Sequence, residues 1–258
     1  MRHEWLLEHR KTEADYWWFV NKRRLVLQLL DAYAPDRGVL LEAGSGGGLF
    51  ASILQEHGWR VVATDLAPDA ARFARAHGVR HAIAMDAATG WPFADDSAEA
   101  LVMLDVLEHI EDDTAALAEV RRVLRPGGIA VVSVPAYQWL FSSWDAYNEH
   151  YRRYTGTRLR KCAQAAGLEV LRLSYWNAVS LPPAICLRLK DRLAGVEYER
   201  LEYPPVPRVV NAALIAYGRI ESTWLQWGSM PAGLSVAVVL RNVDAASCRI
   251  EDREQRPT

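Results

Sequence analysis

A glycine-rich turn between two apolar runs constrains the fold of this chain more than any other feature. The first run, Val39 to Glu42, leads into residues 44–48, where every residue except Ser45 is glycine, and the second run ends at Asp65. Glycines at such a turn let the backbone bend sharply and approach a ligand, and a carboxylate after the second strand is placed to bind a ribose. The pattern predicts a β-α-β unit that binds a nucleoside-containing cofactor.

Apolar runs and stretches of helical periodicity alternate along the rest of the chain. Strands are predicted at residues 39–42, 60–64, 79–85, 100–104, 129–134, 168–174 and 234–240. Helices are predicted at residues 4–33, 49–57 and 68–77, after Asp113, and at residues 157–166 and 209–227. Such regular alternation implies the α/β class, with a doubly wound, mostly parallel seven-stranded sheet and a ligand at the carboxyl ends of its strands.

We expect a single domain over residues 1–243 and a polar tail at residues 244–258. The regular alternation pauses after the fifth strand and again after the sixth. The expected parts of the domain are an N-terminal helical cap (1–36), a cofactor-binding half (38–135) and two insertions that form a substrate lid (136–156 and 176–232).

Composition excludes several classes of protein. The 258 residues include 30 Lys and Arg against 32 Asp and Glu, and a formal charge of −2 gives no general attraction to nucleic acid. The cysteines Cys162, Cys186 and Cys248 lie far apart, so neither a disulfide framework nor a metal site is predicted. Because no apolar stretch is long enough to span a bilayer, we expect a cytoplasmic protein without a transmembrane segment.

The glycine pattern narrows the class of cofactor. A GxGxxG pattern counted from Gly44 would need glycine at Leu49, so the turn matches the shorter GxGxG pattern instead. Two further blocks follow, Leu104 to Ile110 (LDVLEHI) and Arg122 to Gly128 (RVLRPGG). Together these features resemble class I S-adenosylmethionine-dependent methyltransferases over about residues 38–135. The resemblance implies a Rossmann-like methyltransferase fold and S-adenosylmethionine as the cofactor.

The resemblance also implies roles for single residues. Asp65 would accept hydrogen bonds from both ribose hydroxyls, Leu66 would flank the adenine, and Asp86 would accept a bond from the adenine amino group. Glu42 and Asp105 could instead anchor backbone amides, and Asp86 could cap a turn. The residues implied for cofactor binding are Glu42, Gly44, Ser45, Gly46, Asp65, Leu66, Asp86, Ala87 and Asp105. Glu108 and His109 could face the cofactor or could form a helix-start pairing that fixes the loop.

The block from Trp144 to Tyr154 follows the fifth strand, where the methyl group of the cofactor should point. It resembles a His-x-Arg-Arg-Tyr element found in a group of bacterial small-molecule methyltransferases. His150 is the best candidate for a general base, because its ordinary pKa suits proton uptake near neutral pH, and Asp145 could orient it. Arg152 or Arg153 could hold a carboxylate or phosphate of the substrate. The catalytic candidates are His150, Arg153 and Tyr154, with a structural role for His150 and Arg153 as the alternative.

Two apolar segments outside the predicted sheet bear on substrate access. The aromatic run Tyr16 to Phe19 could cover the cofactor and exclude water from a cationic sulfonium, or it could simply pack against the core. The predicted helix at 209–227 has an apolar side that includes Leu225. That side could line a substrate chamber, pair with a second subunit or rest on a membrane surface.

The leading hypothesis is methyl transfer from S-adenosylmethionine to a small-molecule acceptor, such as a natural-product intermediate or a lipid- or sugar-linked intermediate. One alternative is a nicotinamide-dependent oxidoreductase, against which Leu49 and the block around Asp105 argue. A second is a protein that binds the cofactor without turnover. A third is an enzyme that methylates carbon and triggers cyclisation. The acceptor atom and the choice between monomer and homodimer stay open.

Overall fold

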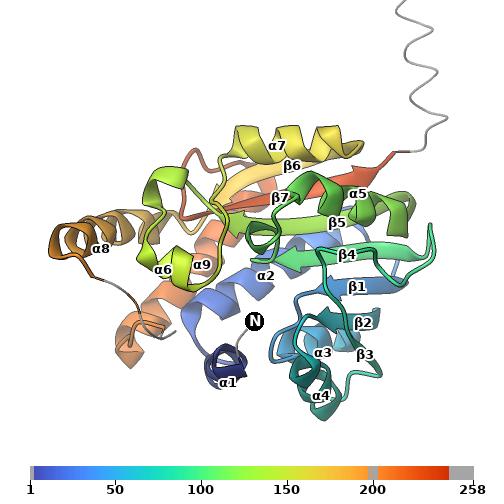
Figure 1. Cartoon of the computed structure of the whole chain (residues 1–258), viewed down its shortest axis with the longest axis horizontal. Coiled ribbons are helices and arrows are strands. Elements are labelled where there is room, and N and C mark those ends of the chain that lie inside the picture. The colour runs from blue at the N-terminus through green and yellow to red at the C-terminus, as the bar shows by residue number, and fades with distance from the viewer. Residues whose placement is uncertain (1–2, 197, 199–202, 244–258) are drawn as a thin grey trace, which may run out of the picture.

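The fold is a seven-stranded sheet with helices on both faces, described by a computed structural model for residues 3–196, 198 and 203–243 (Figure 1). The strand order is β3-β2-β1-β4-β5-β7-β6, and only β7 runs antiparallel to its neighbours. The strands are β1 (Val39–Ala43), β2 (Arg60–Asp65), β3 (His81–Ala84), β4 (Ala98–Leu104), β5 (Leu124–Pro135), β6 (Leu168–Trp176) and β7 (Ser235–Asn242). The predicted α/β class and mostly parallel seven-stranded sheet are confirmed.

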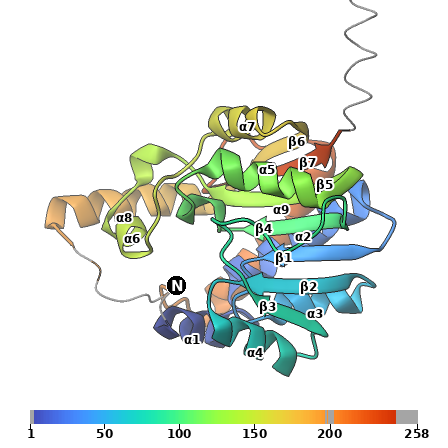
Figure 2. The same cartoon turned by 45° about the vertical axis from the view of Figure 1, so that its right-hand side comes forward.

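The helices divide between the two faces of the sheet, as Figure 2 shows for α5 and α7 against α3 and α4. The helices are α1 (His3–Thr12), α2 (Trp17–Tyr33), α3 (Leu49–Glu56), α4 (Pro68–Ala76), α5 (Asp113–Val123), α6 (Ser143–Tyr147), α7 (Gly156–Ala165), α8 (Leu181–Ala194) and α9 (Arg208–Trp227). Short 3₁₀ turns are η1 (Leu107–His109), η2 (Gln138–Leu140) and η3 (Ala178–Ser180). Helices α2, α3, α4 and α9 share one apolar core with the sheet, and α5 and α7 share the other.

Burial on both faces explains why the central strands are continuously apolar rather than alternating. On β1, Leu40 enters the core under α2 and α3, whereas Leu41 enters the core under α5. On β4, Leu101 and Val102 divide in the same way, and both are fully buried. The carboxyl ends of the parallel strands therefore form one edge, from which polar side chains can reach a ligand.

The predicted helix at residues 4–33 is two helices, which corrects the sequence analysis. The chain leaves α1 after Thr12, and Tyr16 is extended before α2 begins at Trp17. Helix α8 was not predicted, because Pro182 and Pro183 indicated an irregular insertion. Both prolines lie in the first turn of α8, where a missing amide hydrogen has no intrahelical acceptor to lose.

The N-terminal cap and the second insertion pack as one unit. The Nδ2 amide of Asn21 donates to the carbonyl of Leu214 at 2.9 Å, and the backbone amide of Trp17 donates to Oδ1 of Asn211 at 2.9 Å. A Cβ atom at Gly218 would overlap the Asn21 side chain, so glycine permits the close crossing of α2 and α9. The predicted cap and the predicted lid are far apart in the sequence, and these contacts hold their residues together beside the sheet.

The apolar side chains of α9 are not all buried on one continuous face. Leu225 is buried in the core under α2, whereas Val209, Ile220, Trp224 and Trp227 are exposed.

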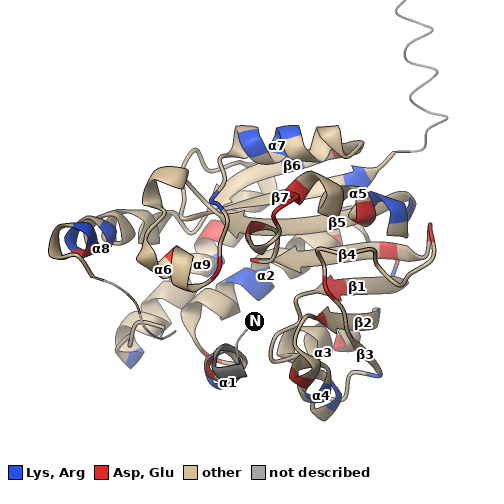
Figure 3. Ribbon diagram, in the orientation of Figure 1, with Lys and Arg blue, Asp and Glu red and all other residues tan. Residues whose placement is uncertain are grey.

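Figure 3 shows Lys and Arg dispersed over several described elements, including α2, α7 and α8. Among the described helices, none combines the length and apolarity required to cross a bilayer. The predicted tail at 244–258 and Cys248 lie outside the described residues.

Candidate functional site

The glycine turn joins β1 to α3 through three residues with positive φ. The φ angles are +81° at Gly44, +52° at Gly46 and +85° at Gly48, which L side chains rarely adopt. A Cβ atom at Gly48 would overlap the backbone of Ala74, so the turn also needs glycine for packing against α4. The amide of Gly44 donates to the carbonyl of Thr64 at 2.8 Å, which holds the turn against the end of β2.

Asp65 ends β2 and is tied to the glycine turn. Its Oδ2 accepts a hydrogen bond from the Gly46 amide at 2.9 Å, and its Oδ1 accepts one from the Ala67 amide at 2.9 Å. The side chain is only 2% exposed, and this burial raises the pKa of the Asp65 carboxyl despite the two amides. The next side chain, Leu66, is 53% exposed. The structure thus brings a carboxylate and an exposed apolar side chain together beside the turn.

Asp86 and Ala87 follow β3 at the same sheet edge. The Met85 amide donates to the Asp65 carbonyl at 2.8 Å, which places this segment next to the end of β2. The exposed Asp86 accepts a bond from the Ala88 amide at 2.8 Å through Oδ1. The turn-capping contact considered from the sequence is therefore present.

Asp105 follows β4 in a left-handed backbone conformation, with φ of 53°. Such a conformation is uncommon for a residue other than glycine and is often retained at functional sites. Its Oδ2 forms an ion pair with the Lys22 ammonium of α2, and its Oδ1 is buried without a described hydrogen-bond partner. The N-terminal cap thus contributes a cation to the centre of the sheet edge.

A cavity of about 50 Å³ lies between the cap and the glycine turn. Its lining includes Phe19 and Lys22 from α2 and Glu42, Gly44 and Ser45 from the β1 side. Oε2 of Glu42 and Oγ of Ser45 are buried without partners among the described residues. Burial raises the pKa of Glu42 well above its usual range, and the nearby carboxyls of Glu13 and Asp65 add to this effect. Unpartnered polar atoms around a cavity indicate a place for a polar ligand.

Glu13 lies over the glycine turn from the end of α1, which the sequence analysis missed. A Cβ atom at Gly47 would overlap the Glu13 carboxyl, and one at Gly46 would lie 3.1 Å from Nε2 of His9. Glu13 is 4% exposed. Burial raises the pKa of its carboxyl to about 7, although a bond from the Leu49 amide acts in the opposite direction. The only signal in the sequence was a short polar interruption of an otherwise helical run.

The predicted pairing of Asp145 with His150 is present after β5. Nδ1 of His150 lies 3.0 Å from Oδ1 of Asp145, and Nε of Arg153 donates to the same oxygen at 2.8 Å. Burial alone would raise the pKa of Asp145, but the bonds from His150 and Arg153 hold it below its usual value. The ionised carboxylate fixes the ring orientation of His150 and leaves its Nε2 directed away from Asp145.

Arg153 and Tyr154 are buried and bonded within the protein. Besides Asp145, Arg153 reaches the carbonyl of Ala136 at 3.3 Å. The Tyr154 hydroxyl donates to Oδ2 of Asp113 at 3.0 Å, and burial raises the pKa of that hydroxyl. Arg152 donates to the backbone carbonyl of Ile110 at 2.8 Å. These contacts tie the segment after α6 to the sheet and to η1, the structural alternative considered from the sequence.

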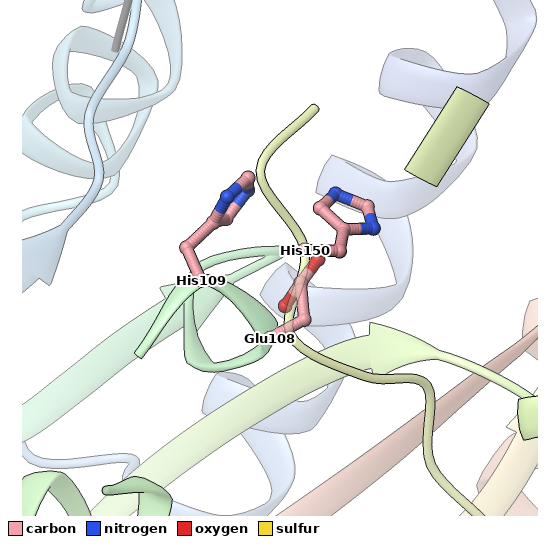
Figure 4. A group of neighbouring side chains, drawn as sticks. All are labelled: Glu108, His109 and His150. Atoms are coloured by element: carbon pink, nitrogen blue, oxygen red, sulfur yellow. The ribbon is translucent and has the colours of Figure 1, made fainter. Parts of the chain in front are cut away.

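Glu108, His109 and His150 come together beyond β4, as Figure 4 shows. Potential ligand atoms from the three side chains all lie within 4.8 Å of one another. The rings of His109 and His150 meet edge to face, with centroids 4.6 Å apart. Burial, together with His150, lowers the pKa of His109 to about 4, so its ring is neutral near pH 7. Sequence analysis considered Glu108 and His109 as a pair but did not place His150 beside them.

Comparisons with known proteins identify the family of this chain. The family model of the methyltransferase domain matches residues 9–173, more than half of the chain. A probable S-adenosylmethionine-dependent methyltransferase of Mycolicibacterium smegmatis is 31% identical over 160 residues, which are 61% of this chain and 61% of that protein. The ubiquinone biosynthesis O-methyltransferase of Xanthomonas oryzae pv. oryzae is 30% identical over 130 residues, which are 45% of this chain and 54% of that protein.

A solved structure supports the fold. The methyltransferase of Haloferax volcanii in complex with the Trm112 methyltransferase activator has a TM-score of 0.62 over 93% of this chain and 96% of that chain, at 19% identity. The chain belongs to the methyltransferase domain family, in the class I S-adenosylmethionine-dependent group. This membership favours the methyltransferase hypothesis over the nicotinamide alternative. The match covers no more than 61% of the length of the two relatives, and their substrates are properties of those proteins.

The residues present fit S-adenosylmethionine. The turn around Gly44 and Gly46 allows close approach of a ligand to the backbone, and Asp65 lies beside it. The buried, unpartnered oxygens of Glu42 and Asp105 are suited to a ligand that carries positive charge on its amino group and sulfur. This fit depends on the chemistry of the glycine turn and of the carboxyl groups named above. The cap covers these groups from one side.

Proposed function

We propose that this chain transfers a methyl group from S-adenosylmethionine to an oxygen atom of a small-molecule acceptor. The observation that carries the proposal is the juxtaposition of two sets of groups at one sheet edge. One set is the glycine turn with Asp65 and the unpartnered oxygens of Glu42 and Asp105, and the other is the cluster that contains His150. The charge of Asp105 acts on His9, which lines the cavity beside Glu42, and on His109 in the cluster.

The cofactor half of the proposal assigns one contact to each group. Bound S-adenosylmethionine supplies an electrophilic methyl group on a positively charged sulfur. Asp65 would accept from the ribose hydroxyls, and Leu66, exposed beside it, would cover one face of the adenine. Glu42 and Asp105 would face the cationic methionine end, where an ionised carboxylate is stabilised by positive charge. Asp86 and the Ala87 amide would read the adenine edge.

The substrate half of the proposal concerns how the acceptor loses its proton. As the bond from methyl carbon to sulfur breaks, the bond from carbon to acceptor oxygen forms, and the hydroxyl proton must leave. His150 would assist that departure, because Asp145 holds its ring and leaves Nε2 available at the cluster. Correct placement of the acceptor in line with the methyl group would supply much of the rate increase.

Arg153 and Tyr154 would act as positioning residues. Arg153 holds the Asp145 carboxylate that orients His150, and Tyr154 bonds to Asp113 beneath η1. Neither side chain is exposed to receive a substrate. The oxygen acceptor is favoured by the relative named as a ubiquinone biosynthesis O-methyltransferase. A natural-product acceptor or a lipid- or sugar-linked acceptor stays a narrower prediction within this class.

Calorimetric titration with S-adenosylmethionine, S-adenosylhomocysteine and NAD tests the cofactor half. We expect the two sulfur nucleosides to bind and Asp65→Ala to weaken binding by about 1–3 kcal/mol, the value of charge-assisted hydrogen bonds. The matched control is Asp36→Ala, an exposed carboxylate before β1 at the opposite edge of the sheet. Equal affinity in Asp65→Ala and wild-type protein would remove Asp65 from the site, and binding of NAD alone would refute the proposed function.

A further inference from the structure

The cluster of Glu108, His109 and His150 has the composition of a metal site, although the sequence analysis predicted none. Glu108 and His109 lie on η1, directly after β4, and His150 follows α6. The two segments are joined, because the Tyr151 amide donates to the Glu108 carbonyl at 2.8 Å. Figure 4 shows the two imidazole rings side by side, with the Glu108 carboxyl below them.

Glu108 is the observation that points to a ligand. Its side chain is 0% exposed, and neither carboxyl oxygen has a hydrogen-bond partner among the described residues. A buried polar group without a partner costs roughly 1–3 kcal/mol, so such groups call for an explanation in a folded protein. A cation at the cluster would bind one of these oxygens and so supply a partner for the buried carboxyl.

The two histidines have the surroundings of metal ligands. An imidazole that binds a metal through one nitrogen usually donates from the other to a carboxylate or a carbonyl, which fixes its tautomer and orientation. Nδ1 of His150 is bonded to the carboxylate of Asp145, which in turn accepts from the Ser142 amide at 2.9 Å. His109 is hydrogen-bonded to the backbone of Glu149. Both rings are thus held by groups outside the cluster.

The charges around the cluster permit a dication. Asp105 and Asp145 flank it, and their charges are offset by Lys22 and Arg153, respectively. Bound to an ion as a carboxylate, Glu108 would give these five groups a net charge of −1, since three carboxylates would face two cations. A divalent ion would therefore meet a negative site whose positive neighbours are already paired.

We propose that Glu108, His109 and His150 bind one divalent first-row transition ion, of which Zn²⁺ is the type. Two imidazoles and one carboxylate suit Zn²⁺, Co²⁺ or Fe²⁺ better than Mg²⁺, which prefers oxygen ligands alone. With bonds of about 2.1 Å in tetrahedral geometry, the ligand atoms would close to about 3.4 Å from one another. The potential ligand atoms lie within 4.8 Å of one another, so binding requires them to move closer together. The remaining coordination position would be open to the acceptor.

The role of the ion rests on the proposed function, whereas its binding does not. An ion beside the methyl group would orient the acceptor hydroxyl and lower its pKa, so that the proton passes to water before the new oxygen–carbon bond forms. In that case His150 assists proton loss as a ligand, and Asp145 and Arg153 position it. The step involves no change of oxidation state, so it requires no further reactant.

The test is a titration of the chelator-treated full chain with Co²⁺ and Zn²⁺, without cofactor. We expect one Co²⁺ per chain, with the visible absorption of a four- or five-coordinate site, and its displacement by Zn²⁺. Glu108→Gln and His150→Ala should each weaken Co²⁺ binding at least about tenfold. The controls are Glu111→Gln and His81→Ala, which alter exposed side chains of the same types. Thermal melts establish that each variant is folded, and His150→Ala carries the test if Glu108→Gln is not.

The outcomes separate this inference from the proposed function. Absence of Co²⁺ and Zn²⁺ binding in the wild-type chain, or equal binding by wild-type protein and both cluster variants, would overturn the metal site. Metal binding without binding of S-adenosylmethionine would uphold the site and refute the proposed function. Cofactor binding without metal binding would overturn the metal site and leave the proposed function standing. Methyl transfer that survives full metal removal would overturn the role of the ion.

Discussion

Titration of Glu13 should make the stability of this protein fall as pH rises from about 5 to about 8. The pKa of the Glu13 carboxyl is raised from its ordinary value of 4.5 to about 7, chiefly by burial over the glycine turn. The folded chain therefore binds this proton more tightly than the unfolded chain. The resulting stabilisation is fully present below pH 4.5 and is lost as pH rises through about 7.

The magnitude follows from the size of the shift. A difference of about 2.5 pKa units at about 1.36 kcal/mol per unit gives a total of roughly 3 kcal/mol, of which about 2.5 kcal/mol falls between pH 5 and pH 8. Glu13→Gln removes the titrating group and keeps the shape of the side chain. Its stability relative to wild type should therefore increase with pH by about that amount.

Urea denaturation of wild-type protein and Glu13→Gln at pH 5 and pH 8 measures this difference. Hydrogen exchange of the α1 amides at both pH values would show whether the loss is confined to undocking of α1. Glu56→Gln, an exposed position at the end of α3, is the control for the substitution itself. If the stability difference between Glu13→Gln and wild type is the same at both pH values, burial of the carboxyl over the turn is refuted.

Two further predictions concern the turn and the cluster. Gly48→Ala should destabilise the fold by about 1–3 kcal/mol or more, because φ is +85° and the new Cβ atom would overlap the Ala74 backbone. The control is Gly90→Ala, because a Cβ atom at Gly90 would meet open space. Equal melting temperatures of the two variants would contradict the argument. His150→Ala should slow methyl transfer by about 10²–10⁴ while sparing affinity for S-adenosylmethionine. Unchanged turnover in steady-state assays would leave His150 with a structural role alone.

The elements that could be predicted are those whose signal is local. The glycines at 44–48 and the carboxylate of Asp65 lie at opposite ends of one β-α-β unit, and the structure joins them through the Gly46 amide. Helix α8 was missed because a proline pair breaks a helix in its interior but starts one in its first turn. The break between α1 and α2 was missed because helical periodicity continues on both sides of it.

The sequence by itself determined the α/β class, the seven apolar strands and the cofactor half, because apolar periodicity and turn residues act over a few neighbouring positions. Only the tertiary structure placed Glu13 over Gly47 and His150 beside Glu108. These neighbours are distant along the chain, and their contacts arise from the packing of the cap and of the segment after β5 on the sheet edge. The same packing buries the Glu108 carboxyl without a hydrogen-bond partner in the part of the chain that the structure describes, which no local pattern encodes.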